Sequence, residues 1–174
     1  MEFIRLTTPA DPRFAEAMAL YRQSFPLHEQ REAPSQAAAL AQADYRFNLI
    51  QDGDALLGLL LCWEAPAFCY VEHFCIDPGL RGQGCGAQAL ALLRAQGRPV
   101  ILEIDPPVDG ISRRRLGFYR RAGYCENPYP HVHPPYRAAY GGHPLVVLSC
   151  PAPLAPAEYA RFSDYLCQNV MKPL

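Results

Sequence analysis

The chain has 174 residues, of which 50% are hydrophobic and 19% charged, and its formal net charge is -1. This composition is typical of one globular domain over residues 1–174, and it excludes a disordered, collagen-like or coiled-coil chain. Since cationic residues are not in excess, we expect neither nucleic acid nor an anionic membrane as a partner.

The cysteines and the N-terminus indicate a reducing compartment. The chain has 7 cysteines and no Cys-x-x-Cys pair, which argues against a disulfide framework and a thiolate zinc site. The N-terminal sequence lacks the apolar segment of a signal peptide. The longest apolar run, residues 55–63, is far shorter than the ~20 residues of a membrane helix. We therefore expect a cytoplasmic protein.

The N-terminal half predicts helices and strands in alternation. Asp52-Gly53 separates two apolar runs and predicts a hairpin turn between them. From Pro12 onward apolar side chains recur at helical spacing, and Asp11 is the expected N-cap of that helix. The expected elements are, in chain order, a strand (3–8), a helix (12–25), an alanine-rich helix (34–42) and strands (45–51, 55–64 and 68–76).

The C-terminal half ends in an amphipathic helix. Its apolar stripe is expected to pack on the sheet or on a second copy of the chain in a homodimer. The expected elements after residue 80 are a helix (86–96), a strand (100–104), a basic helix (112–122), a strand opening at Tyr124, an aromatic loop (127–144), a strand (145–150) and the amphipathic helix (156–171).

This order predicts an α/β (α+β) fold. Consecutive strands joined by tight turns favour antiparallel pairing, whereas the strand-helix-strand unit over residues 68–104 favours one parallel β-α-β crossover. We therefore expect a mixed, mostly antiparallel sheet of six or seven strands with helices on both faces.

Two short motifs indicate chemistry. Residues 81–86, Arg-Gly-Gln-Gly-Cys-Gly, lie between a strand and a helix, where open backbone N–H groups and the helix dipole suit a pyrophosphate. Downstream, Phe118 and Tyr119 are adjacent and face different directions, so one can enter the core while the other reaches a cleft. The simpler alternatives are an ordinary glycine turn and two core aromatics.

Together, R-x-x-G-x-G after a strand and F-Y-x-x-x-G-Y one strand later resemble the GNAT acetyltransferase superfamily. The element order is also similar to the GNAT fold over most of the chain. The resemblance implies acetyl-CoA as co-substrate and direct acetyl transfer to a primary amine of a small molecule, amino acid or peptide.

The resemblance also implies where acetyl-CoA binds. Its pantetheine arm would follow the end of the strand over residues 68–76, which must then part from residues 100–104 through a bulge near Phe74 or Cys75. A backbone N–H there would polarise the thioester carbonyl. The implied cofactor-binding residues are Phe74, Cys75, Ile76, Arg81, Gly82, Gln83, Gly84, Cys85, Gly86 and Ala87.

For catalysis, Tyr119 matches the family's general-acid tyrosine. An alkylamine with a pKa of ~10.4 is mostly protonated at neutral pH, so a base is useful, with Glu72 as first candidate and Glu103 as second. Each glutamate is alternatively a polar residue satisfied by its neighbours. By analogy with the family, the loop over residues 127–144 and the turn over residues 24–31 form the acceptor end. The expected acceptor-binding residues are Glu29, Glu103, His133 and Tyr136.

Other hypotheses stay open. Ser112 stands where the family often has a cofactor-contacting Asn. His131 and His133 lack an evident third ligand, so we expect no metal. A non-catalytic acyl-CoA-binding module on the same fold is one alternative. A Rossmann-type NAD(P) oxidoreductase is another, because Gly82, Gly84 and Ala87 fit G-x-G-x-x-A and Asp105 follows at a suitable spacing.

Overall fold

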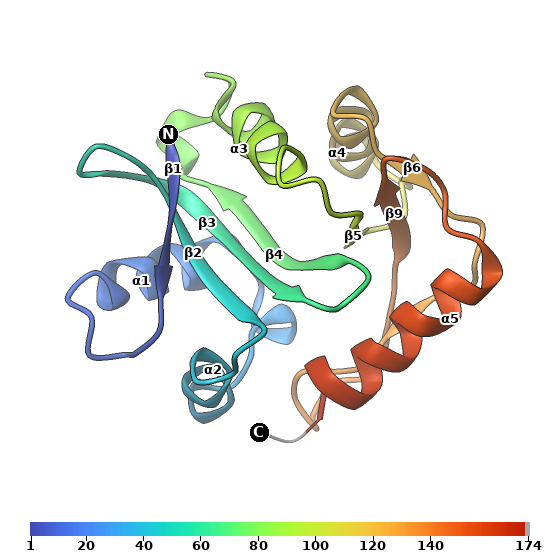
Figure 1. Cartoon of the computed structure of the whole chain (residues 1–174), viewed down its shortest axis with the longest axis horizontal. Helices are drawn as coiled ribbons and strands as arrows, with labels where there is room; N and C mark the ends of the chain where they lie inside the picture. Colours follow the sequence, from blue (N-terminus) through green and yellow to red (C-terminus); the bar gives the residue numbers. More distant parts are fainter. Residues whose placement is uncertain (173–174) are drawn as a thin grey trace.

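The computed structural model describes residues 1–172 and is built around one seven-stranded sheet with the strand order β1-β2-β3-β4-β5-β9-β6 (Figure 1). The strands of this sheet are β1 (Glu2–Leu6), β2 (Tyr45–Asp52), β3 (Ala55–Glu64), β4 (Cys69–Ile76), β5 (Val100–Ile104), β6 (Cys125–Glu126) and β9 (Val146–Cys150). The α-helices are α1 (Phe14–Ser24), α2 (Ala33–Leu40), α3 (Cys85–Arg94), α4 (Gly110–Arg121) and α5 (Pro156–Tyr165).

The pairing confirms the predicted mixed sheet. β4 and β5 run parallel, whereas the other pairs in the described part of the chain are antiparallel. The helix that connects the parallel pair is α3, as the strand-helix-strand pattern predicts. The Rossmann-type alternative is wrong, because that fold requires an open sheet of mostly parallel strands.

Helices cover both faces of the sheet, as predicted (Figure 1). On one face, α1 and α2 pack against β2 and β3, and α5 packs against β4, through one cluster that includes Tyr21, Phe47 and Phe162. On the other face, α3 and α4 pack through a cluster that includes Leu90 and Leu116. The two clusters are separated by the sheet, so the apolar residues of its central strands are buried on both sides.

The central feature of the sheet is the separation of β4 from β5. Their pairing ends at Val71 opposite Leu102, so within residues 1–172 the rest of β4 has no strand partner on that side. The register with β3 shifts between Leu61, paired with His73, and Cys62, paired with Val71, which leaves Glu72 as an extra residue. Such a bulge bends its strand. The predicted parting is confirmed, but the bulge lies at Glu72 and not near Phe74 or Cys75.

Three local expectations were wrong. Helix α1 has Arg13 at its N-cap, and Asp11 instead accepts from the Arg13 backbone N–H at 2.9 Å in the preceding turn. The last helix is α-helical only to Tyr165 and continues as the π-helical turn η3 (Leu166–Val170), which buries Leu166 and Val170. The aromatic loop contains a two-stranded ribbon of β7 (Val132–His133) and β8 (His143–Pro144).

The short segments matter for the site. Two 3-10 turns, η1 (Leu27–Glu29) and η2 (Pro78–Leu80), follow α1 and β4 respectively.

Helix α5 packs on the sheet through Phe162, whose ring lies 5.3 Å from that of Tyr70. No helix in residues 1–172 combines the length and apolar character that a bilayer crossing requires.

The close approach of β3 and β4 at Gly58 can be tested. A Cβ atom at this position would lie 2.2 Å from the Cys75 carbonyl oxygen and 3.0 Å from the Ile76 Cα atom, so backbone must move. We expect Gly58→Ala to lower the free energy of unfolding by about 1–3 kcal/mol in denaturant titrations. Gly141→Ala, where a Cβ meets no atom within 4 Å, is the control and should change it by less than about 0.5 kcal/mol. Equal stability of the two variants would contradict this packing.

Candidate active site

A cavity of about 1030 Å³ lies where β4 and β5 separate. Its walls come from the unpaired end of β4, the end of β5, the start of α3, the aromatic pair on α4, η1, and the segment over residues 133–145. Its size matches the range of small-molecule and cofactor sites. The sheet therefore opens into a binding cavity at the point where its hydrogen-bond ladder stops.

The cavity brings together almost all of the residues predicted from the sequence. Gln83 is outside it: its side chain is exposed and donates to the Gly79 carbonyl at 3.3 Å. The predicted residues that line the cavity are Glu29, Glu72, Phe74, Cys75, Ile76, Arg81, Gly82, Gly84, Cys85, Gly86, Ala87, Glu103, Tyr119, His133 and Tyr136. The roles of these residues remain predictions, but their convergence is a property of the fold.

The glycine turn has the geometry of an anion site. Gly82 and Gly84 have φ angles of 81° and 82°, in the left-handed region that favours glycine, and Gly84 is the N-cap of α3. Within residues 1–172, no backbone carbonyl accepts from the N–H groups of Gly84 to Ala87. Arg81 is exposed and makes no ion pair with the described residues. The turn thus presents open N–H groups and one free cation to the cavity.

The unpaired edge of β4 forms the adjoining wall. Phe74 pairs with Leu60 and Ile76 with Gly58, both on β3, while the opposite edge faces the cavity. Its main-chain groups are therefore available to an extended ligand, which can pair with them as an additional strand does.

Tyr119 is positioned by a well-capped helix. Asp109 caps α4 by accepting from the Ile111 and Ser112 N–H groups, both at 2.8 Å. The Tyr119 ring packs against Phe118 and Tyr124 and is only 8% exposed. Burial raises the pKa of its hydroxyl to about 12 from an ordinary value at which a phenol is already protonated at neutral pH. A proton donor in this position needs that property.

Glu72 is held in a buried ion pair. One carboxylate oxygen accepts from Arg31 Nε and the other from Trp63 Nε1, each at 2.8 Å, and the Glu72 side chain is fully buried. Burial opposes ionisation, but the Arg31 guanidinium together with the Trp63 N–H and other neighbours outweighs it and holds the pKa of the carboxyl below its ordinary value. The geometry therefore disfavours Glu72 as a catalytic base. The bulge explains this, because Glu72 is the residue without a partner on β3 and its carboxylate meets Trp63 and Arg31.

Glu103 is also fully engaged. Its Oε2 accepts from the Tyr70 hydroxyl at 2.5 Å, and its Oε1 accepts from His131 Nε2. Burial again opposes ionisation, but the hydrogen bonds from His131 and Tyr70 and the nearby imidazole of His133 together outweigh it, so the pKa of Glu103 is lowered. His133 Nε2 lies 3.9 Å from Glu103 Oε2. Glu103 is thus a buried anion that faces two imidazoles.

His133 has a free ring nitrogen inside the cavity. Its Nδ1 lies 2.6 Å from the Pro134 carbonyl oxygen, which can only accept, so Nδ1 carries the proton. The neutral ring then has its lone pair on Nε2, which is buried and has no hydrogen-bond partner in the described part of the chain. Buried acceptors in folded proteins normally have a hydrogen-bond partner, and a ligand N–H would supply the one that is missing here.

His73 is a site residue that sequence reasoning missed. Its Nε2 donates to the Glu29 carbonyl at 2.8 Å, and its buried Nδ1 has no partner within residues 1–172. Burial lowers the pKa of His73 and keeps the ring neutral. The Tyr136 ring lies close to both imidazoles, with its centroid 5.6 Å from that of His73 and 4.9 Å from that of His133. The adjacent polar pair Glu72-His73 in an otherwise apolar strand was the available signal.

The family comparison agrees with this geometry. Residues 14–124 match the model of the acetyltransferase (GNAT) family. The chain belongs to the GNAT acetyltransferase family. The resemblance deduced from the glycine and aromatic motifs is therefore confirmed, and so is the GNAT fold.

Individual relatives extend this assignment. A structure named "Putative acetyltransferase from GNAT family from Bacteroides thetaiotaomicron" superimposes with a TM-score of 0.93 at 28% identity, with 100% of both chains covered. "Putative acetyltransferase YjbC" of Bacillus subtilis (strain 168) is 27% identical over 56% of this GNAT chain, which spans only 50% of that relative's length. An aminoglycoside 6'-N-acetyltransferase complexed with coenzyme A shares the fold, with a TM-score of 0.56 at 14% identity over 86% of this chain and 96% of that one.

The buried ion pair of Glu72 leads to a stability prediction. Glu72→Gln leaves the Arg31 charge, 3% exposed, without its counter-ion, so we expect the free energy of unfolding to fall by about 3–5 kcal/mol in urea titrations. Glu64→Gln removes the partner of the half-buried Arg46 and should cost less than about 1 kcal/mol. If Glu72→Gln were as stable as the Glu64 variant, the structural role of this pair would be refuted.

Proposed function

We propose that this GNAT protein is an acetyl-CoA-dependent N-acetyltransferase, which transfers the acetyl group directly to a primary amine of a small molecule, amino acid or peptide. The observation that carries the proposal is one continuous cavity that joins the open start of α3, the free edge of β4 and the protonated Tyr119. The CoA complex of the aminoglycoside acetyltransferase, which shares the fold, supports the choice of donor.

In this proposal the cofactor follows the cavity wall. The pyrophosphate would lie against the backbone N–H groups of Gly84 to Ala87, with Arg81 as an added charge. The acyl-pantetheine arm would pair with the free edge of β4 over Phe74 to Ile76. A β4 N–H group directed at the thioester carbonyl would stabilise the oxyanion of the tetrahedral intermediate.

The acceptor must lose a proton before it can attack. An alkylamine with a pKa of ~10.4 is rarely neutral at pH 7, a cost of about 4.6 kcal/mol that a base offsets. Since both carboxylate oxygens of Glu72 and of Glu103 are engaged, we assign the base to His133 Nε2. The Glu103 carboxylate at 3.9 Å would stabilise the resulting imidazolium.

The transfer step then balances. The neutral amine attacks the thioester carbonyl, the C–N bond forms, and the C–S bond breaks as the tetrahedral intermediate collapses. Before the attack the ammonium proton passes to His133, directly or through one water, and Tyr119 donates its proton to the departing CoA sulfur. The second proton, which the nitrogen loses as the amide forms, returns Tyr119 to its protonated state through solvent. The acidic and basic groups therefore come from different walls of the cavity, α4 on one side and β7 on the other.

The function test combines binding and turnover. Calorimetry with acetyl-CoA should give one site per chain, and acetylation of an amine panel should release free CoA thiol. Tyr119→Phe should reduce kcat by ~10²-fold or more while acetyl-CoA affinity stays within threefold, because only the leaving-group proton is lost. Tyr129→Phe, whose hydroxyl binds the Leu154 carbonyl outside the cavity, is the matched control. Failure to bind acetyl-CoA would overturn the proposal. Binding without transfer to any amine would favour the acyl-CoA-binding module instead.

The base assignment has a distinct signature in the pH profile. A base acts only when unprotonated, so kcat/KM should fall on the acidic side for the unmodified protein. The His133→Gln variant should lose most of its activity. The kcat/KM that remains should no longer fall on the acidic side. In Glu103→Gln the rate should fall but the acidic limb of the pH profile should remain, because His133 Nε2 is still present to accept the proton. Circular dichroism would confirm that both variants are folded. An unchanged limb in His133→Gln would refute the assignment.

A further inference from the structure

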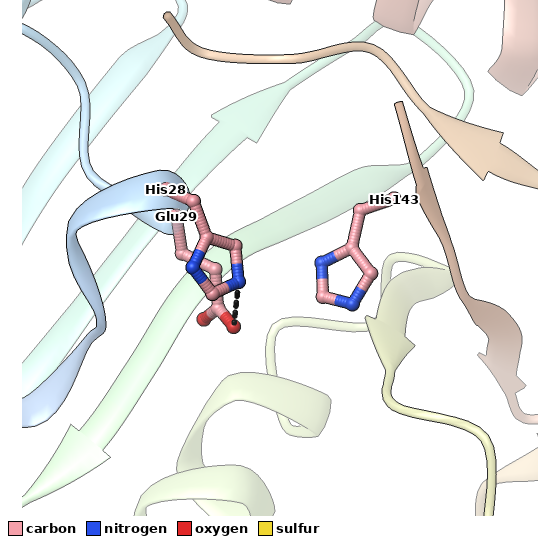
Figure 2. A group of neighbouring side chains, drawn as sticks. All are labelled: His28, Glu29 and His143. Carbon is pink, nitrogen blue, oxygen red and sulfur yellow. Dashed lines mark ion pairs between the residues drawn. The ribbon is translucent and has the colours of Figure 1, made fainter. Parts of the chain in front are cut away.

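A cluster of metal-ligating side chains stands at the acceptor-side mouth of the cavity. His28 and Glu29 come from η1, and His143 comes from β8, more than a hundred residues later in the sequence. Figure 2 shows the three side chains turned toward one another across the gap between these segments. One ligand atom from each residue lies within 4.8 Å of the other two. The proposed acetyl transfer uses none of these groups for chemistry.

From this geometry we propose that His28, Glu29 and His143 bind one divalent transition-metal ion of the zinc class. His28 Nε2 lies 3.6 Å from Glu29 Oε1. A tetrahedral zinc ion with bonds of ~2.0–2.2 Å has ligand atoms roughly 3.3–3.5 Å apart, so small side-chain rotations complete the set. Two imidazoles and one carboxylate are donors that zinc accepts, whereas Mg²⁺ and Ca²⁺ prefer oxygen donors throughout.

Asp105 orients one of the ligands. Its Oδ1 lies 3.4 Å from His143 Nε2, and its Oδ2 binds Arg115 at 2.5 Å. With Nε2 directed at the carboxylate, the other nitrogen of His143 faces His28 and Glu29, as Figure 2 shows. A carboxylate behind a metal-bound histidine is the usual outer partner, because it selects the tautomer whose lone pair is directed at the ion. Asp105 is therefore a positioning residue of this site.

The two segments that supply the ligands are already fastened together. Arg137, in the connection between β7 and β8, donates from Nε to the carbonyls of Leu27 and Gln30, each at 3.1 Å. The rings of His28 and His143 pack edge to face at 5.4 Å between centroids. These contacts reduce the freedom that the ligands lose on binding an ion.

Charge and access favour occupation by a cation. With neutral imidazoles the ligand set carries one negative charge from Glu29, and Asp105 adds another behind it. The three ligand side chains are between 32% and 41% exposed, so an ion can enter from solvent. Three protein ligands leave one tetrahedral position for water or for a donor atom of a bound molecule. The ion would tie η1 to the β7–β8 ribbon across the cavity mouth.

The test uses the full-length chain, stripped with EDTA and without any CoA, so it is independent of acetyl transfer. Titration with ZnCl₂ should show one ion per chain, and zinc should raise the melting temperature. His143→Ala and His28→Ala should each weaken zinc binding by at least tenfold and abolish the thermal shift. Asp105→Asn should weaken it by about 10–100-fold, as loss of an outer partner does. The metal-free variants should match the unmodified chain in circular dichroism and melting temperature.

The exposed thiol of Cys167 is the main competing ligand, and Cys167→Ser is the matched control. This variant should keep full zinc affinity. Co²⁺ as a spectroscopic probe should give tetrahedral d–d bands without a sulfur-to-metal charge-transfer band. The proposal would be overturned by absence of zinc binding, by full affinity in His143→Ala, or by loss of binding in Cys167→Ser.

Discussion

The separation of β4 from β5 is the constraint on which the rest of the molecule depends. The two strands pair over only three residues each, because the bulge at Glu72 bends β4 away from its neighbour. The bulge is held in place by the buried contacts of Glu72 with Arg31 and Trp63. A sheet that stayed paired to the end of β4 would leave neither a free edge nor a cavity. A charged residue that looks catalytic in the sequence thus builds the site by deforming the strand.

Burial then decides which polar groups remain available for chemistry. Glu72 and Glu103, two of the carboxylates that line the cavity, have lowered pKa values because the guanidinium, N–H and hydroxyl groups around their oxygens together outweigh the effect of burial. His73 and His133 each have one buried ring nitrogen without a hydrogen-bond partner among residues 1–172. Lone pairs of this kind accept protons or N–H donors, whereas each oxygen of Glu72 and of Glu103 already accepts a hydrogen bond. The arrangement favours an imidazole over a carboxylate as the base in the proposed reaction. The acceptor-side mouth of the cavity, with two further imidazoles and a carboxylate, has the donor set of a metal site.

Much of this architecture could be predicted. Short sequence patterns predict the hairpin at Asp52-Gly53 and the glycine turn before α3. The order of one strand, one helix and one strand predicts the parallel crossover. Errors arose where a neighbouring turn or packing against distant residues competes with the predicted pattern. Asp11 has the chemistry of an N-cap but serves the preceding turn. The last helix changes to a π-helical turn at Leu166, where its apolar side chains enter the core.

By itself the sequence determined the family, the order of the elements and the stretch of main chain available to a diphosphate, because glycine positions and apolar periodicity act locally. Only the tertiary structure decided which polar atoms are free. Glu72 meets Arg31 across 41 positions, and Glu103 meets His131 across 28. The gathering of His28, Glu29 and His143 likewise depends on η1 and β8 meeting in space. Hydrogen-bond partners at such separations are set by how the sheet and its loops pack, and no short-range pattern contains that information.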